Sequence, residues 1–171
     1  MVDIRQLPLR YISLALGDVT VSDDMREPRP LLPFLEPFYR AVVPLAWPIV
    51  RVGVGWDLIV HGWGKVMRGP AAQAVLLARD GYDFGISLAL LLIFVELIGG
   101  ICIALGLFTR FFAAAVAIEM GVLTFDHYWS HGFSWLRQGY EYTLLWGMMS
   151  LAIALRGGGA FSLDRKIGRE L

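Results

Sequence analysis

The sequence has almost no cysteine. Cys102 is the single cysteine among 171 residues, and no CxxC motif is present. An intramolecular disulfide, a thiol redox centre and a cysteine-ligated zinc site are therefore excluded, and we interpret Cys102 as a small apolar filler. No GxGxxG motif follows a strand pattern, which also excludes a dinucleotide-binding fold.

Charge is scarce as well. Charged residues make up 18% of the chain, whereas an average soluble domain has about 25%, and fifteen basic residues balance fifteen acidic ones. A net charge of zero offers no basic surface for nucleic acid, so we predict no nucleic-acid partner. In contrast, 57% of the residues are hydrophobic. This composition predicts a membrane protein in contact with the lipid bilayer.

The longest apolar run covers residues 86–108 and carries one charge, Glu96. Its 23 residues would form a helix of about 33 Å, enough to cross a hydrocarbon core of about 30 Å. Glu96 would then lie near the bilayer centre, where a charged side chain costs about 3 kcal/mol. We therefore expect Glu96 to face protein and to bind another polar side chain.

Three further apolar segments have the length or pattern of spans: residues 41–63, 111–129 and 140–155. The first contains Pro44 and Pro48 near its beginning, so the sequence does not fix where this helix starts. If it starts near residue 41, Arg51 lies at the depth of Glu96 and is the leading candidate for its partner.

We predict an all-α fold, an integral membrane four-helix bundle over residues 41–156. An N-terminal extension (residues 1–40) is partly irregular, with membrane-surface binding and partner docking both open, and residues 157–171 form a tail. Ten of the fourteen Lys and Arg residues outside the spans lie on the side of the termini. The positive-inside rule therefore predicts a multi-pass protein of the bacterial cytoplasmic membrane with both termini cytoplasmic.

Ionisable residues gather in two predicted layers. The deeper layer holds Glu96, Glu119 and, with an early helix start, Arg51. The outer layer comes from three helices and comprises Asp57, His61, Lys65, Asp126, His127, His131 and Glu141. Two interpretations stay open: interhelical ion pairs that fix the bundle, or an outward-facing polar cavity that binds a quinone or relays protons. The histidines lack a regular ligand spacing, so we predict neither a metal nor a haem site.

In the second interpretation the outer layer supplies the site. Its candidate proton-exchanging residues are His61, Glu96 and Glu141, and its candidate cofactor-binding residues are Asp57, His61, Lys65, His127 and Glu141. We predict that His61 and Glu141 point into one cavity, because histidine suits proton exchange near neutral pH and a carboxylate beside it favours the charged imidazolium. Aromatic walls are expected from Trp56, Trp63 or Tyr142.

Six short motifs carry a resemblance to a known family: HGWGK at 61–65, ELIGG at 96–100, GLFTR at 106–110, HGF at 131–133, GYEY at 139–142 and FSLD at 161–164. In order and spacing they resemble the DoxX family over about residues 48–171. The resemblance implies a four-helix membrane protein related to the small membrane subunit of thiosulfate:quinone oxidoreductase, a family also linked to membrane-associated redox-defence complexes. The first forty or so residues lie outside it.

Two functions follow. The first is the membrane subunit of a quinone-linked oxidoreductase that takes electrons from a periplasmic donor or partner subunit, with a periplasm-facing cavity for quinone or proton exchange. No self-contained redox centre is visible, so whether the chain is itself an enzyme stays open. The alternative is a non-catalytic accessory subunit that docks onto a larger membrane complex. The outer polar layer favours the first function, and the long N-terminal extension favours the second.

Overall fold

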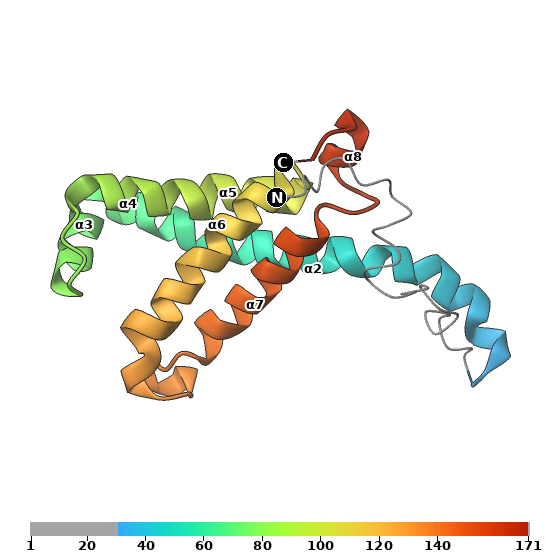
Figure 1. Cartoon of the computed structure of the whole chain (residues 1–171), viewed down its shortest axis with the longest axis horizontal. Coiled ribbons are helices and arrows are strands. Elements are labelled where there is room, and N and C mark those ends of the chain that lie inside the picture. Colours follow the sequence, from blue (N-terminus) through green and yellow to red (C-terminus); the bar gives the residue numbers. More distant parts are fainter. Residues whose placement is uncertain (1–30, 171) are drawn as a thin grey trace, which may run out of the picture. The chain divides into compact units, whose positions relative to one another are not determined.

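The computed structural model describes residues 31–170, and its regular elements in that range are all helices (Figure 1). The chain divides into two compact units, Met1–Tyr39 and Arg40–Leu171. In the first unit, the described residues form the short 3-10 helix η3 (Pro33–Leu35) and the beginning of helix α2 (Glu36–Arg68). Most of the predicted extension, residues 1–30, lies outside the described residues.

Helix α2 begins before residue 41, the start expected from the apolar run. Its 33 residues include Pro44 and Pro48 in the helix interior. A proline removes one backbone hydrogen bond, and membrane helices tolerate this loss because neighbouring groups satisfy the freed carbonyl. The prolines therefore do not mark the beginning of this helix, and Arg51 lies well inside it.

The second apolar run forms three consecutive helical segments: α4 (Gly85–Ile93), the π-helical turn η4 (Phe94–Ile98) and α5 (Gly99–Leu105). The π-helical turn contains Glu96, and such turns frequently occur at functional sites. The helix ends three residues before the predicted end, because Gly106 takes a left-handed conformation with φ of 71° and caps it.

The second half of the chain forms two helices that pack side by side (Figure 1). The first consists of α6 (Thr109–Val122), the π-helical turn η5 (Leu123–Tyr128) and the 3-10 turn η6 (Trp129–His131). After a loop that contains η7 (Trp135–Arg137), α7 (Glu141–Arg156) returns along α6. Two short helices complete the described fold, α3 (Pro70–Arg79) before α4 and α8 (Leu163–Ile167) near the end.

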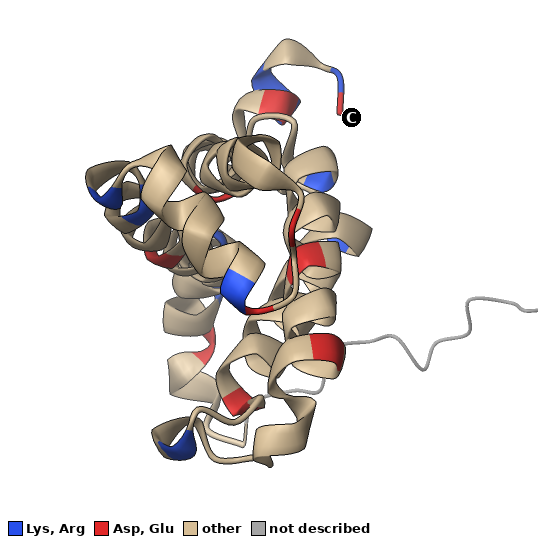
Figure 2. Cartoon of the chain, turned by 90° about the vertical axis from the view of Figure 1, so that its left-hand side faces the viewer, with Lys and Arg blue, Asp and Glu red and all other residues tan. Residues whose placement is uncertain are grey.

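Within residues 31–170, three helices are long and apolar enough to cross a membrane: Pro33–Arg68, Gly85–Leu105 and Thr109–His131. Charged residues are sparse along the helices, and most of the ribbon is tan (Figure 2). Large apolar side chains such as Ile118, Met148 and Leu155 are exposed, as expected for surfaces that face lipid. The predicted all-helical membrane fold is thus confirmed for the described residues. A fourth crossing by α7, which has 16 residues, stays a prediction.

Glycines set the register between α2 and the second span. A Cβ atom on Gly55 would lie 2.5 Å from the Gly100 carbonyl oxygen, and one on Gly62 would lie 2.6 Å from the Leu97 nitrogen. The two backbones are therefore in direct contact, as small residues allow in membrane helix pairs. This register brings Lys65 of α2 level with Glu96.

The segment after α7 packs against the helices as a fixed part of the fold. The buried Asp164 carboxylate accepts hydrogen bonds from the Phe108 nitrogen (2.7 Å), the Thr109 nitrogen (3.0 Å) and the Thr109 hydroxyl (2.6 Å). The buried Arg51 guanidinium donates to the carbonyl oxygens of Gly158 and Phe161. Arg51 therefore holds the C-terminal segment, and the predicted pairing of Arg51 with Glu96 is wrong.

Candidate functional site: a cavity between the helices

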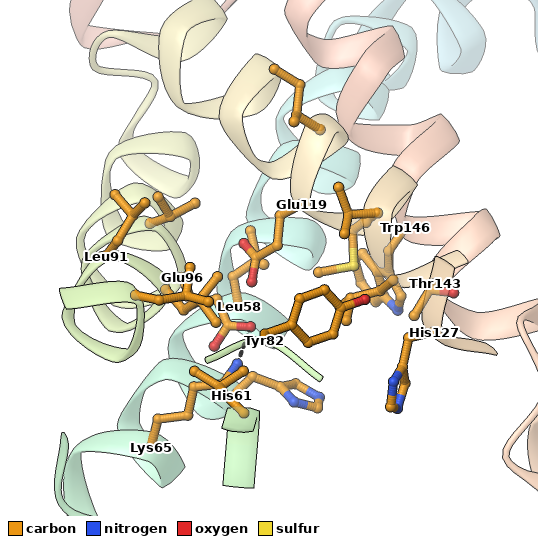
Figure 3. A pocket seen from close by; sticks show the side chains of 18 of the residues that line it. Leu58, His61, Lys65, Tyr82, Leu91, Glu96, Glu119, His127, Thr143 and Trp146 are labelled. Carbon is orange, nitrogen blue, oxygen red and sulfur yellow. Dashed lines mark ion pairs between the residues drawn. The ribbon is translucent and has the colours of Figure 1, made fainter. Parts of the chain in front are cut away.

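A cavity of about 610 Å³ lies between the helices of the second unit (Figure 3). Its walls are mainly apolar, and they include Leu58, Leu88, Leu91, Leu92, Val95, Ala115, Ile118, Met120, Val122 and Leu123. Ionisable side chains from α2, η4, α6, η5 and the α3–α4 connection line the same space. Cavities of this size, with apolar walls and a few converging polar groups, are typical small-molecule binding sites.

Glu96 and Lys65 form an ion pair at the side of this cavity (Figure 3). The Glu96 side chain is only 3% exposed, and its Oε1 atom contacts the Lys65 ammonium. The prediction that Glu96 is buried against a polar partner is confirmed, but the partner is Lys65. The reason is the antiparallel register of the two helices: Gly62 lies against Leu97, so Arg51, about three turns away, lies beside Gly106 instead.

Glu119 of α6 also lines the cavity and points toward this ion pair (Figure 3). It lies close enough to Glu96 and Lys65 for electrostatic coupling. Within residues 31–170, neither of its buried carboxylate oxygens has a hydrogen-bond partner, and the same is true of Glu96 Oε2. The site therefore combines two carboxylates with one ammonium group.

Asp57, His61 and Tyr142 form a second polar group on the cavity lining. The Tyr142 hydroxyl donates to Asp57 Oδ1 at 2.6 Å, and Asp57 Oδ2 lies 3.8 Å from His61 Nε2. The His61 side chain is 53% exposed, so it lies at the rim. His61 therefore connects the cavity lining with its exposed rim.

Tyr82 and His127 line the cavity on another side. The Tyr82 hydroxyl donates to Asp126 Oδ2, and the ring centres of Tyr82 and His127 lie 6.4 Å apart. Burial, together with the Asp126 carboxylate, raises the pKa of Tyr82 to about 12, so this phenol stays protonated at neutral pH. Sequence reasoning missed Tyr82, since it lies in a connection between helices with no periodic pattern to mark it.

Glu141 does not line the cavity, and its Oε2 atom accepts a hydrogen bond from the Trp135 nitrogen at 3.2 Å. Trp56 and Trp63 are exposed and do not line it either. The prediction that His61 and Glu141 share a cavity is therefore wrong. Successive residues of a helix point about 100° apart, and Tyr142, the next residue of α7, faces the cavity instead.

In the described part of the chain, no group of three or more His, Cys, Asp or Glu side chains could hold a metal ion. Two of the outer-layer histidines, His127 of η5 and His131 of η6, have ring centres 6.3 Å apart, but only His127 lines the cavity.

A chain of apolar helices with an ion pair and a ligand-sized cavity between them is a membrane protein with an internal polar site. A family model described as DoxX matches residues 46–129, which include Lys65, Glu96 and Glu119. A protein of Haemophilus influenzae, described as an uncharacterized protein, is 30% identical over 132 residues, covering 74% of this chain and 94% of the relative. The chain belongs to the DoxX family. No solved structure matches it.

Proposed function

We propose that this protein binds a quinone in the cavity and serves as the membrane subunit of a quinone-linked oxidoreductase. The observation that carries this proposal is the cavity itself, about 610 Å³ in volume and largely apolar, with Lys65 and His61 as polar groups that can donate hydrogen bonds. A quinone head group is a flat apolar ring with two carbonyl oxygens, so it needs apolar walls and a few donors.

The apolar tail of a quinone needs a way out of the cavity into the lipid. Three lining residues offer one, since Leu91 is 55% exposed, Ile118 69% and Val122 46%. These residues come from α4 and from α6, which packs against α5 and diverges from α4 (Figure 1). A tail leaving between α4 and α6 would enter the hydrocarbon layer.

Protons and electrons have different sources in this proposal. His61 and Glu96 stay the candidate proton-exchanging residues, with Asp57, Lys65 and His127 in contact with the ligand space. Glu141 is no longer a candidate, because it does not line the cavity. Electrons come from a periplasmic donor or partner subunit, because the sequence offers no thiol, flavin or iron–sulfur centre of its own.

An accessory role without catalysis is the second candidate. It is favoured by exposed apolar residues in the first unit, among them Leu31 and Phe34, which a partner subunit would cover. The two candidates differ in one measurable property, because the accessory role requires no ligand in the cavity.

Quinone binding is tested by fluorescence, because Trp146 lines the cavity. We expect decylubiquinone to quench the purified protein saturably and Trp146→Phe to remove most of that signal. Ala115→Phe fills the cavity and should weaken binding about tenfold or more. Ala114→Phe is the matched control, since Ala114 is exposed and does not line the cavity. Quenching that rises linearly with the quinone concentration, or that is equal in Ala115→Phe and Ala114→Phe, contradicts the proposal.

Both termini are proposed to be cytoplasmic, because ten of fourteen positive charges outside the spans lie on their side. A reporter enzyme that is active only in the periplasm should be silent when fused after Leu171 and active when inserted at Ser134. The reverse result would place the cavity rim and His61 on the cytoplasmic side.

A further inference from the structure

We infer that Glu119 holds an exchangeable proton in the cavity and that its protonated carboxyl group donates the hydrogen bond to a carbonyl oxygen of the ligand. The ligand part rests on the proposed function, whereas the proton on Glu119 does not. The ligand is then the oxidised quinone, because its carbonyl oxygens accept hydrogen bonds.

The charges around Glu119 favour its protonated form. Lys65 is the ammonium group beside the two carboxylates, and it contacts Glu96 Oε1. This ion pair is neutral as a unit, and it leaves Glu119 without a cation of its own. A carboxylate that is buried with no hydrogen-bond partner is strongly disfavoured and takes up a proton.

The other ionisable groups of the cavity lining do not replace that cation. On α2, Asp57 accepts from Tyr142 and lies beside His61, which is at the exposed rim. From the α3–α4 connection come Asp80, an acid, and Tyr82, whose hydroxyl is bonded to Asp126.

The remaining titratable groups of the lining lie on η5, where His127 and Tyr128 contact each other edge to face. Among the residues of the described structure, none of these groups is hydrogen-bonded to a Glu119 oxygen. Near a protonated Glu119 the available acceptor is Glu96 Oε2, which has no donor of its own among the described residues, so this O–H group lies between the ion pair and the apolar-walled cavity.

A bound quinone would offer this O–H group a second acceptor. Its carbonyl oxygen accepts from Glu119, and the Lys65 ammonium lies near enough to Glu119 to polarise the same head group. Binding then favours protonated Glu119, and loss of the proton places a carboxylate against a carbonyl oxygen. The expected sign is weaker quinone binding as pH rises, by up to about tenfold per pH unit once Glu119 ionises in the free protein.

Two measurements on the purified full chain test this inference separately from the proposed function. The first needs no ligand: infrared spectroscopy at neutral pH should show a protonated carboxyl band that disappears in Glu119→Gln and shifts in Glu119→Asp. Glu141→Gln is the matched control and should keep the band, because Glu141 lies outside the cavity. A band that survives Glu119→Gln, or is absent from the wild type, overturns the inference even if quinone binds.

The second measurement is the affinity for decylubiquinone as a function of pH. The wild type and Glu141→Gln should show the loss of affinity described above. Glu119→Gln should bind with little dependence on pH, since its amide is a donor at every pH. Equal pH profiles for wild type and Glu119→Gln overturn the inference while leaving quinone binding intact. If the infrared band behaves as expected but no quinone binds, the proposed function and the ligand part fail, and the proton site on Glu119 stands.

Discussion

Replacement of Asp164 by alanine is expected to lower the free energy of unfolding by about 3–5 kcal/mol. Asp164 is 3% exposed and accepts three hydrogen bonds from the turn between α5 and α6. Alanine would leave the Phe108 and Thr109 donors buried without a partner. It would also loosen the C-terminal segment, whose Gly158 and Phe161 carbonyl oxygens accept hydrogen bonds from Arg51.

Thermal or denaturant unfolding in detergent micelles measures this effect. Asp164→Asn keeps one acceptor oxygen and should recover part of the loss. Asp83→Ala is the control, because it removes an exposed acid and should change stability by no more than about 0.5 kcal/mol. If Asp164→Ala unfolds like Asp83→Ala, the C-terminal segment is not held by the contacts described above.

Glu96→Leu is expected to be the second most damaging change, at a cost of about 3–5 kcal/mol. It removes the carboxylate that contacts the Lys65 ammonium, and Glu119 can replace that carboxylate only by losing its own proton. Glu96→Gln should be milder, since its amide oxygen still accepts a hydrogen bond from Lys65.

The double variant Glu96→Leu with Lys65→Met separates the energy of the ion pair from the energy lost through changed side-chain packing. Because the unpaired charge is also removed, the double variant should be more stable than Glu96→Leu alone, and a double-mutant cycle measures the coupling. If the effects of the two single changes simply add, Lys65 and Glu96 do not stabilise each other.

The fold was largely predictable from the sequence because a bilayer imposes simple requirements on length and polarity. Residues 86–108 could only be a long apolar helix, and the single acid within them had to be buried against protein. The start of α2 was less certain from sequence, since Pro44 and Pro48 read as helix breakers although membrane helices tolerate them.

The partners within the site were harder to predict because they depend on register between helices. Lys65 rather than Arg51 reaches Glu96 because Gly62 lets α2 contact the backbone at Leu97. Sequence spacing gives the face of one helix, but it does not give its sliding position along another. Glu141 was chosen for another reason: the sequence does not tell which face of α7 is turned to the cavity, and its neighbour Tyr142 lies on that face.

Arg51 shows a different limit. A charged residue inside a predicted span was expected to pair with another charge in a span. Its acceptors are backbone carbonyls of Gly158 and Phe161, more than a hundred residues later in a segment that reads as a loose tail. Carbonyl oxygens carry no sequence signature, so this contact could not be found from residue types.

Photolabelling of the purified full chain with an azido-quinone is the most direct measurement of the central claim, that the cavity binds a quinone. Peptide mapping should place the label on residues that line the cavity, such as His61, Leu88 and Trp146. Excess decylubiquinone and the Ala115→Phe substitution should both suppress this labelling. Label spread over lipid-facing residues such as Met148 and Leu155, and unchanged by competitor or substitution, would contradict it.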